Sequence, residues 1–248
     1  MHEENKYDVS IVIPCYQEEK HILDSVKEIY KVLNETKYKF EIIFIEDKSI
    51  DRTKEKISEI EQIFPNVHTL FHEKNLGKGA SIMNGSKIAR GKFVGHIDID
   101  LEISANYLPN IIAELEKGND IVLVQRKISF NPQFILRDVG GMIHRSIVRH
   151  FLSIPYTDVQ SGCKFFKKEV LLTLLENVRA TGWFFDVELI THAYHRNYSV
   201  KQIPGSFIRS KKKKSTVKLF RDGMEQIKSL IKFRKQIKKE KMSRLRST

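Results

Sequence analysis

The chain has 248 residues, of which 41% are hydrophobic and 10% aromatic, so it can bury one sizeable core and is not an intrinsically disordered protein. Its apolar runs are much shorter than the ~20 residues of a membrane-spanning helix, its N-terminus lacks the apolar stretch of a signal peptide, and its two cysteines are too few for a disulfide framework, which together predict a cytoplasmic protein. The formal net charge of +12 is concentrated between Arg209 and Arg246, a pattern found in nucleic-acid-binding segments, in helices on anionic membranes and in ordinary solvated helices.

Short apolar runs alternate with helix-length segments through the first half of the chain. The runs are rich in Val, Ile and Phe, as buried parallel strands are, and they predict strands at residues 9–16, 40–45, 67–71, 93–99 and 120–124. Helices predicted from the apolar spacing lie between them and begin near Ile22, Ile57, Lys78 and Leu108. This order predicts a parallel sheet with right-handed crossovers, which binds ligands beyond the carboxyl ends of its strands.

The second half of the chain is less regular. An amphipathic helix is predicted at residues 134–152, shorter helices at 169–178 and 186–195, and strands at 164–166 and 199–207. A long basic helix with interleaved apolar residues is predicted at residues 217–239. We therefore expect one α/β domain at residues 1–216, followed by a basic amphipathic helix and tail at residues 217–248.

Two acids, Asp98 and Asp100, end the fourth predicted strand. Residues two apart in a strand face the same side, so both carboxylates can reach one ion. Carboxylates and substrate phosphates suit Mg²⁺ or Mn²⁺, which would neutralise the charge of a departing nucleoside diphosphate. Two solvated acids at a strand end are the simpler interpretation of this pair alone.

Further motifs follow the other predicted strands in a fixed order. The sequence reads IVIPCYQEE at residues 11–19, IEDKSIDRT at 45–53, NLGKGA at 75–80 and DIDLE at 98–102. Farther on it reads VQR at 124–126, DVQSGCKFF at 158–166 and GWFFDVEL at 182–189. This order, from about residue 9 to about residue 218, resembles glycosyltransferase family 2, the inverting nucleotide-sugar transferases that include dolichyl-phosphate mannosyl- and glucosyltransferases. The last two segments look most like the glucosyltransferase branch.

The resemblance implies a GT-A, Rossmann-like fold with a mostly parallel sheet flanked by helices. It implies nucleotide-sugar contacts from Pro14, Tyr16, Glu18, Asp47, Asn75, Gly77, Lys78 and Asp98, with Asp47 accepting a hydrogen bond from the nucleobase. It also implies a metal ion on Asp98 and Asp100, with Glu102 as a third ligand or a solvated acid. The chain departs from the family's pattern at Gln17, where Asn is usual, and at Glu46, where Asp is usual.

The expected reaction is a metal-dependent, inverting transfer of a hexose from a UDP- or GDP-sugar. Its catalytic residues would be Asp98, Asp100, Arg126 and Lys164. A polyprenyl or dolichyl phosphate acceptor is already an anion near pH 7 and needs no strong general base. Its phosphate would be held by Arg126, Arg137, Lys164 and Arg209. The alternative is a saccharide hydroxyl acceptor, which needs a base and would take it from Asp158, Asp186 or Glu188.

The basic C-terminal helix fits the lipid acceptor, because interleaved basic and apolar residues can lie on an anionic membrane surface. We therefore expect peripheral association with the membrane. A nucleic-acid-binding module is a second interpretation, but RNA-recognition, zinc-finger and helix-turn-helix signatures are all missing from the sequence. A catalytically inactive relative is a third, and the intact acids Asp47, Asp98 and Asp100 argue against it.

Overall fold

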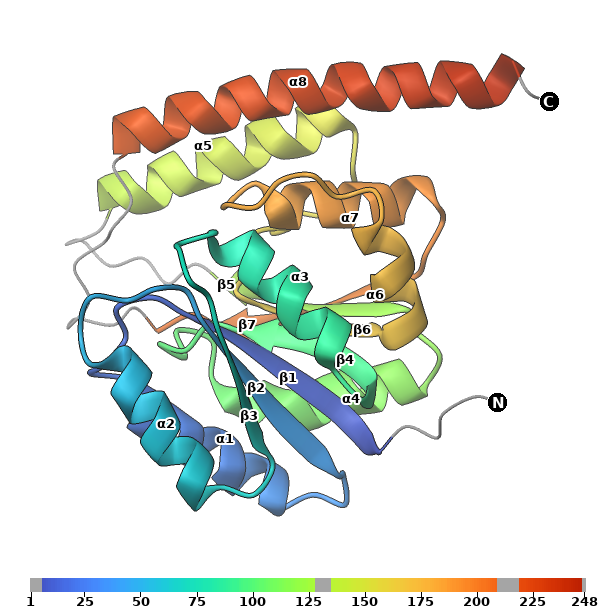
Figure 1. Cartoon of the computed structure of the whole chain (residues 1–248). Coiled ribbons are helices and arrows are strands. Elements are labelled where there is room, and N and C mark those ends of the chain that lie inside the picture. Colours follow the sequence, from blue (N-terminus) through green and yellow to red (C-terminus); the bar gives the residue numbers. More distant parts are fainter. Residues whose placement is uncertain (1–5, 128–134, 209–218, 247–248) are drawn as a thin grey trace. The chain divides into compact units, whose positions relative to one another are not determined.

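The structure is a computed structural model that describes residues 6–127, 135–208 and 219–246 (Figure 1). Side chains of its two longest helices are described for residues 139–152 and 226–239. The chain forms two compact units. We call them the sheet unit, Met1–Ser129 with Asp158–Arg209, and the two-helix unit, Phe130–Thr157 with Ser210–Thr248.

The sheet unit is built on a seven-stranded sheet in the order β3-β2-β1-β4-β6-β5-β7. The strands are β1 (Tyr7–Cys15), β2 (Phe40–Glu46), β3 (Val67–Phe71), β4 (Gly91–Ile97), β5 (Ile121–Lys127), β6 (Cys163–Lys167) and β7 (Val200–Ser206). All neighbouring strands pair in parallel except β6, which runs antiparallel to both β4 and β5. The predicted α/β class with a mostly parallel sheet is therefore confirmed.

Helices cover both faces of this sheet, as Figure 1 shows for the sheet unit. On one face lie α1 (Ile22–Asn34), α2 (Thr53–Ile63) and α4 (Leu108–Glu116), with the short 3-10 helix η1 (Ala105–Tyr107) before α4. On the other lie α3 (Lys78–Ile88), α6 (Lys168–Leu175) and α7 (Phe185–His195). Because both faces are covered, β2 is buried along its whole length, which explains the apolar run at its centre, residues 42–45.

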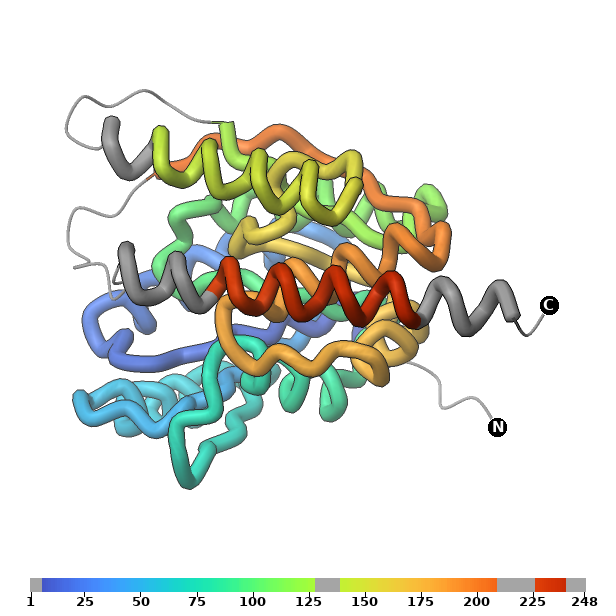
Figure 2. The backbone as a smooth tube through the Cα atoms, turned by 90° about the horizontal axis from the view of Figure 1, so that it is seen from above, coloured from blue at the N-terminus to red at the C-terminus, as the bar shows by residue number. Residues whose placement is uncertain are grey.

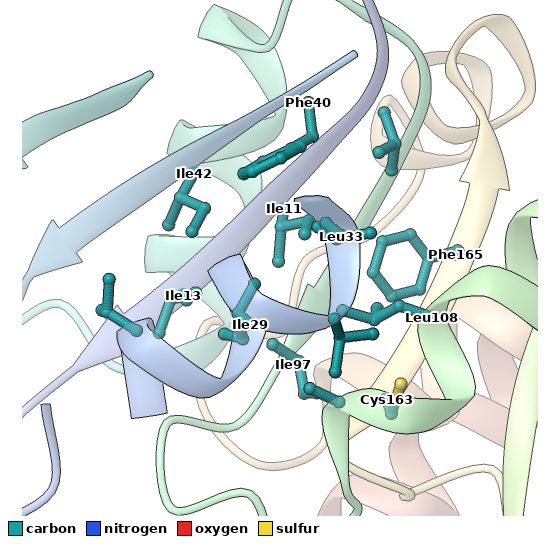
Figure 3. Packing of buried hydrophobic residues seen from close by; sticks show 14 of the residues in the cluster. Ile11, Ile13, Ile29, Leu33, Phe40, Ile42, Ile97, Leu108, Cys163 and Phe165 are labelled. Atoms are coloured by element: carbon teal, nitrogen blue, oxygen red, sulfur yellow. The ribbon is translucent and has the colours of Figure 1, made fainter. Parts of the chain in front are cut away.

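The core between β1 and α1 follows from the two periodicities of strand and helix. Ile11 and Ile13, two apart on β1, point toward Ile29 and Leu33, four apart on α1, and all four are fully buried (Figure 3). Farther along the sheet, Phe165 of β6 fills the space over β4, where a Cβ on Gly95 would lie 2.2 Å from its ring. This packing fixes the strands whose carboxyl ends carry the polar motifs.

The two-helix unit contains α5 (Ile135–Leu152) and α8 (Leu219–Arg246), which run along each other in Figures 1 and 2. The Arg234 guanidinium lies 4.3 Å from the centre of the Phe151 ring, a cation–π contact between the two helices. The predicted domain boundary between residues 216 and 217 assigned α5 and α8 to different domains, whereas in the structure they belong to one unit. No helix in the described residues combines the length and apolar composition needed to cross a membrane.

Candidate active site

The carboxyl edge of the sheet carries unusual backbone conformations. Gln17, Lys48 and Leu101 follow β1, β2 and β4, and each is a non-glycine residue in the left-handed region, with φ of 59°, 61° and 46°. Such a conformation costs roughly 1–2 kcal/mol per residue and is concentrated at functional sites. Three strained loops at one edge of the sheet therefore mark this edge as the candidate site.

The loops after β1 and β2 are tied to each other. The Gln17 amide donates to Ser49 Oγ at 3.0 Å, and the Glu18 amide donates to Thr53 Oγ1 at 2.8 Å. Glu46 is buried and its Oε1 accepts the Ser49 amide at 2.5 Å, so this departure from the family pattern shapes the loop. Of the predicted nucleotide contacts here, Tyr16 is 42% exposed, Pro14 is half-buried and Glu18 is buried.

Asp47 is buried and organises the next loop. Its Oδ1 accepts the Leu76 amide and its Oδ2 the Gly77 amide, each at 2.8 Å, while Asn75 Nδ2 donates to the Asp47 carbonyl at 3.1 Å. The structure thus brings the predicted residues Asp47, Asn75 and Gly77 together. It gives Asp47 a role in shaping the loop, and its contact with a nucleobase stays a prediction.

Gly77 is required by both conformation and packing. Its φ is 92°, and a Cβ there would lie 2.8 Å from the Thr181 carbonyl oxygen. A Cβ on Gly79 would lie 2.6 Å from Phe185 Cβ. These glycines therefore allow close packing of the turn against Thr181 and Phe185. Because the Gly77 amide already donates to Asp47, an anion contact by Gly77 stays a prediction.

The first acid of the DIDLE segment forms an ion pair with a lysine. β4 ends at Ile97, two residues earlier than predicted, because the chain turns there and the Leu101 amide bonds back to the Asp98 carbonyl. Asp98 Oδ1 lies 2.5 Å from Lys78 Nζ. Burial alone would raise the pKa of Asp98, but the Lys78 ammonium outweighs it and holds that pKa below its usual range.

The described residues hold no group of three or more His, Cys, Asp or Glu side chains placed to bind a metal ion. Asp98, Asp100 and Glu102 are therefore not gathered into a three-carboxylate site, and Glu102 as a ligand stays a prediction. Asp98 nevertheless has the chemistry of a ligand, since its carboxylate already holds the cationic group of Lys78. The position of this carboxylate depends on Gly162, where a Cβ would lie 2.1 Å from Asp98 Oδ2. Two carboxylates with substrate phosphates fit Mg²⁺, which keeps few protein ligands.

Arg126, at the end of β5, is held by Asp158. Its Nε and Nη2 donate to the two carboxylate oxygens at 2.8 and 2.6 Å, and its backbone amide donates to Asp158 Oδ2 at 3.0 Å. Burial would lower the pKa of Arg126, but Asp158, with Asp98 and Glu102 nearby, raises it. The guanidinium is therefore a fixed positive charge close to the DIDLE acids.

Lys164 is paired with an acid inside the sheet unit. Its side chain is fully buried and its Nζ donates to the Ser161 carbonyl and, at 2.8 Å, to Asp186 Oδ1. His96 Nε2 lies 3.4 Å from the same oxygen. Burial would raise the pKa of Asp186, but Lys164 and His96 lower it well below its usual range. In this structure Lys164 neutralises the buried Asp186, and its contact with an acceptor phosphate stays a prediction.

Glu188 is also buried, and its Oε2 accepts the amides of Arg179 and Ala180 at 2.7 and 3.0 Å. Of the predicted acceptor contacts, Arg209 and the side chain of Arg137 lie outside the described residues. Two histidines that our sequence analysis did not select, His72 and His96, are buried at the site. The sequence signal that could have identified them is their position, since His96 lies near the end of β4 and His72 directly follows β3.

Comparisons with known proteins agree with this geometry. The family model of glycosyl transferase family 2 matches residues 10–175. A dolichyl-phosphate beta-glucosyltransferase of Trichomonas vaginalis is 30% identical over 215 residues, which cover 79% of this chain and 64% of that protein. Glycosyltransferase AglD of Haloferax volcanii is 26% identical over 204 residues, 79% of this chain and 32% of that protein. The chain thus spans less than two thirds of the length of either relative.

A solved structure has the same fold. It is glucosyl-3-phosphoglycerate synthase from Mycobacterium tuberculosis in complex with Mn²⁺, uridine diphosphate and phosphoglyceric acid. The TM-score is 0.70 at 18% sequence identity, and the match covers 92% of this chain and 78% of that one. At this identity the likeness shows the fold alone.

Proposed function

The chain belongs to glycosyl transferase family 2 and is a glycosyltransferase of GT-A fold, and from that premise we propose that it transfers a hexose from a UDP- or GDP-sugar to a polyprenyl phosphate. In the proposed step an acceptor phosphate oxygen bonds to the anomeric carbon from the face opposite the leaving group. The bond from that carbon to the diphosphate oxygen breaks, and the nucleoside diphosphate leaves with the electron pair. The anomeric configuration is thereby inverted.

The observation that carries this proposal is the state of the three candidate bases. Asp158 is paired with Arg126, Asp186 with Lys164, and Glu188 accepts two backbone amides. All three carboxylates are buried. A hydroxyl acceptor needs a base that reaches its proton, whereas a phosphate monoester attacks as an anion. The bonding of these acids therefore favours the phosphate acceptor over the saccharide hydroxyl.

The donor side of the proposal uses the strained edge of the sheet. Tyr16 offers an exposed ring directly after Cys15, whose carbonyl accepts the Asp47 amide, and Lys78 offers a positive charge to the diphosphate. Mg²⁺ or Mn²⁺ would be held by Asp98 and Asp100 together with the diphosphate, whose developing charge it would stabilise. The protein's own part is then to position and neutralise the leaving group.

For the acceptor, Arg126 is the proposed contact among the described residues, because only one edge of its guanidinium is occupied by Asp158. Arg137 and Arg209 remain proposed contacts.

The exposed residues of the two-helix unit support a lipid acceptor. Ile227 and Ile231 are exposed one turn apart on α8, and each is followed by an exposed lysine, Lys228 or Lys232. On α5, exposed apolar residues recur at every fourth position, namely Val139, Ile143 and Ile147. We propose that these apolar and basic residues meet an anionic membrane surface.

A donor and acceptor screen tests the proposal. Several UDP- and GDP-hexoses would be combined with Mg²⁺ or Mn²⁺ and with three acceptors: polyprenyl phosphate, the matching polyprenol, and an oligosaccharide. Mass spectrometry should detect a glycosylated polyprenyl phosphate and neither of the other two products. Product from the oligosaccharide alone would replace the lipid phosphate with the hydroxyl acceptor.

A further inference from the structure

His72 is a buried histidine with a partner on each ring nitrogen. It directly follows β3, and its Nδ1 lies 2.8 Å from Asp47 Oδ1. Its Nε2 lies 3.0 Å from Asn84 Nδ2 on α3. Its backbone amide donates to the Glu46 carbonyl at 2.9 Å, which fixes the residue beside the end of β2. The ring is therefore held at both nitrogens, and the backbone amide fixes the residue that carries it.

The direction of these bonds follows from Asp47. That carboxylate accepts the amides of Leu76 and Gly77, and an ionised carboxylate can only accept. His72 Nδ1 must therefore carry the proton and donate to Asp47. In the neutral ring Nε2 is then an acceptor, and it takes a hydrogen bond from the amide group of Asn84.

Residues 75–78, which we call the Lys78 turn, depend on the carboxylate that His72 orients. Asp47 binds two successive amides of this turn, and the next residue is Lys78, whose Nζ reaches Asp98. A rotation of the Asp47 carboxylate would break both amide bonds. We propose that His72 is a positioning residue, which holds Asp47 so that the Lys78 turn presents its lysine to the diphosphate of the donor. The statement about the donor rests on the proposed function, whereas the statement about the turn does not.

Three substitutions separate this role from simple core packing. Asn places its amide nitrogen where Nδ1 lies, so His72→Asn keeps the bond to Asp47. Gln places its amide where Nε2 lies, so His72→Gln keeps only the bond to Asn84. His72→Ala keeps neither. The matched control is His68→Ala, because His68 lies on β3, four residues before His72, but contacts Arg90 instead.

The first measurement is amide hydrogen exchange at Leu76 and Gly77, made by NMR on the full chain without added nucleotide. Losing a hydrogen bond to a charged group should speed exchange of these two amides by about tenfold or more in His72→Ala and His72→Gln. In His72→Asn and His68→Ala the rates should stay within about threefold of the unaltered protein. Thermal unfolding of each variant shows that the comparison is made between folded proteins.

The second measurement is calorimetric titration with uridine diphosphate and guanosine diphosphate in Mn²⁺. We expect His72→Ala and His72→Gln to weaken the preferred diphosphate about tenfold, with His72→Asn close to the unaltered protein. If the unaltered protein binds neither diphosphate, the proposed donor is wrong, and the exchange data still decide the role of His72. Unchanged exchange in His72→Gln, or equal acceleration in His72→Asn and His72→Gln, would overturn the proposal. The Asn and Gln variants alone decide it if His72→Ala does not fold.

Discussion

Lys78 Nζ lies 2.5 Å from Asp98 Oδ1 and 5.3 Å from the centre of the Trp183 ring. The lysine therefore places a positive charge on the carboxylate to which we assign the metal ion, next to the only tryptophan of the chain. Burial would lower the pKa of Lys78, but the surrounding acids, Asp98 first, raise it, so the lysine is charged. A divalent ion and Lys78 then compete for one acid, while both favour the donor's diphosphate.

Lys78→Ala should therefore act in opposite directions on two ligands. Removing the competing ammonium should tighten binding of Mn²⁺ alone by about fivefold or less, since a partly exposed ion pair contributes at most about 1 kcal/mol. Binding of the nucleoside diphosphate should weaken, because a charge that meets it is gone. Electron paramagnetic resonance of free Mn²⁺ measures the first effect, and tryptophan fluorescence from Trp183 measures the second.

Lys74→Ala is the matched control for that experiment, because Lys74 is an exposed lysine just before the Lys78 turn. It should leave both affinities unchanged. If Lys78→Ala weakened Mn²⁺ and diphosphate alike, the lysine would support the metal site and not compete with it.

Asp98→Ala and Asp100→Ala should each reduce transfer by roughly a hundredfold or more, because charge stabilisation by a metal ion is worth several kcal/mol. Chelation by EDTA should have the same effect on the unaltered protein and add nothing to either variant. Asp24→Ala, an exposed acid on α1, is the control. Product formation measured by mass spectrometry checks the prediction, and full activity in EDTA would remove the metal from the mechanism.

The sequence predicted the sheet well because its signals are local. The apolar run at residues 42–45 in β2 and the apolar spacing of α1 depend only on which faces are buried, and both elements are present where expected. The D-x-D pair also lies at the predicted edge of the sheet. The reversed direction of β6 was not predicted, because the sequence of a five-residue strand carries no sign of its orientation.

The individual roles of the charged residues were harder to predict, because they depend on partners far away in the sequence. Lys164 resembled a phosphate-binding lysine, yet its partner is Asp186 in another element. Asp47 resembled a nucleobase ligand, and the structure gives it a second role that the motif did not indicate, since it holds the Lys78 turn together with His72. A motif shows which residue types meet at a site, but burial and pairing decide which of them reach the ligand.

The buried pair of Lys164 and Asp186 predicts a large effect on stability. Lys164→Met leaves the buried Asp186 carboxylate without its lysine, with His96 Nε2 still 3.4 Å away, and should lower the free energy of unfolding by about 3–5 kcal/mol. Adding Asp186→Leu removes the orphaned charge and should recover much of that loss. Urea denaturation followed by circular dichroism measures both values. Loss of acceptor affinity without loss of stability in Lys164→Met would instead support the predicted phosphate contact.

The same pair sets a dependence on acid. The pKa of Asp186 is lowered in the folded protein, so its stabilising contribution is complete above its unfolded value of about 3.9 and is lost as the pH falls toward the folded value. The unaltered protein should therefore lose stability steadily below about pH 4. The double variant Lys164→Met with Asp186→Leu should lose less over the same range, as thermal unfolding at a series of pH values would show.

The exposed face of α8 gives the last prediction, which concerns the proposed membrane surface. Ile227 and Ile231 are 45% and 44% exposed and lie one turn apart, with Lys228 and Lys232 beside them. Burying such side chains in a bilayer contributes about 1 kcal/mol each, so Ile227→Gln with Ile231→Gln should weaken binding to vesicles about tenfold or more. Co-sedimentation with phosphatidylserine-containing vesicles measures the partition. The control, Ile50→Gln with Ile63→Gln, removes two isoleucines that are 87% and 66% exposed in the sheet unit, and it should have no effect.

The lysines separate the charge contribution from the apolar one on the same helix. Lys228→Ala with Lys232→Ala should weaken binding at low salt by about 1 kcal/mol per residue and reduce its salt dependence, because surface charges are screened within about 8 Å at physiological ionic strength. The isoleucine variant should keep the salt dependence and lose affinity at every salt concentration. Both variants should slow transfer to long-chain polyprenyl phosphate in vesicles and leave nucleoside diphosphate binding intact, since the proposed donor contacts lie in the sheet unit.

Circular dichroism must show that both variants of α8 are folded. If both folded variants bound vesicles as tightly as the unaltered chain, α8 would be a solvated helix, and the lipid acceptor would rest on the bonding of Asp158, Asp186 and Glu188 alone.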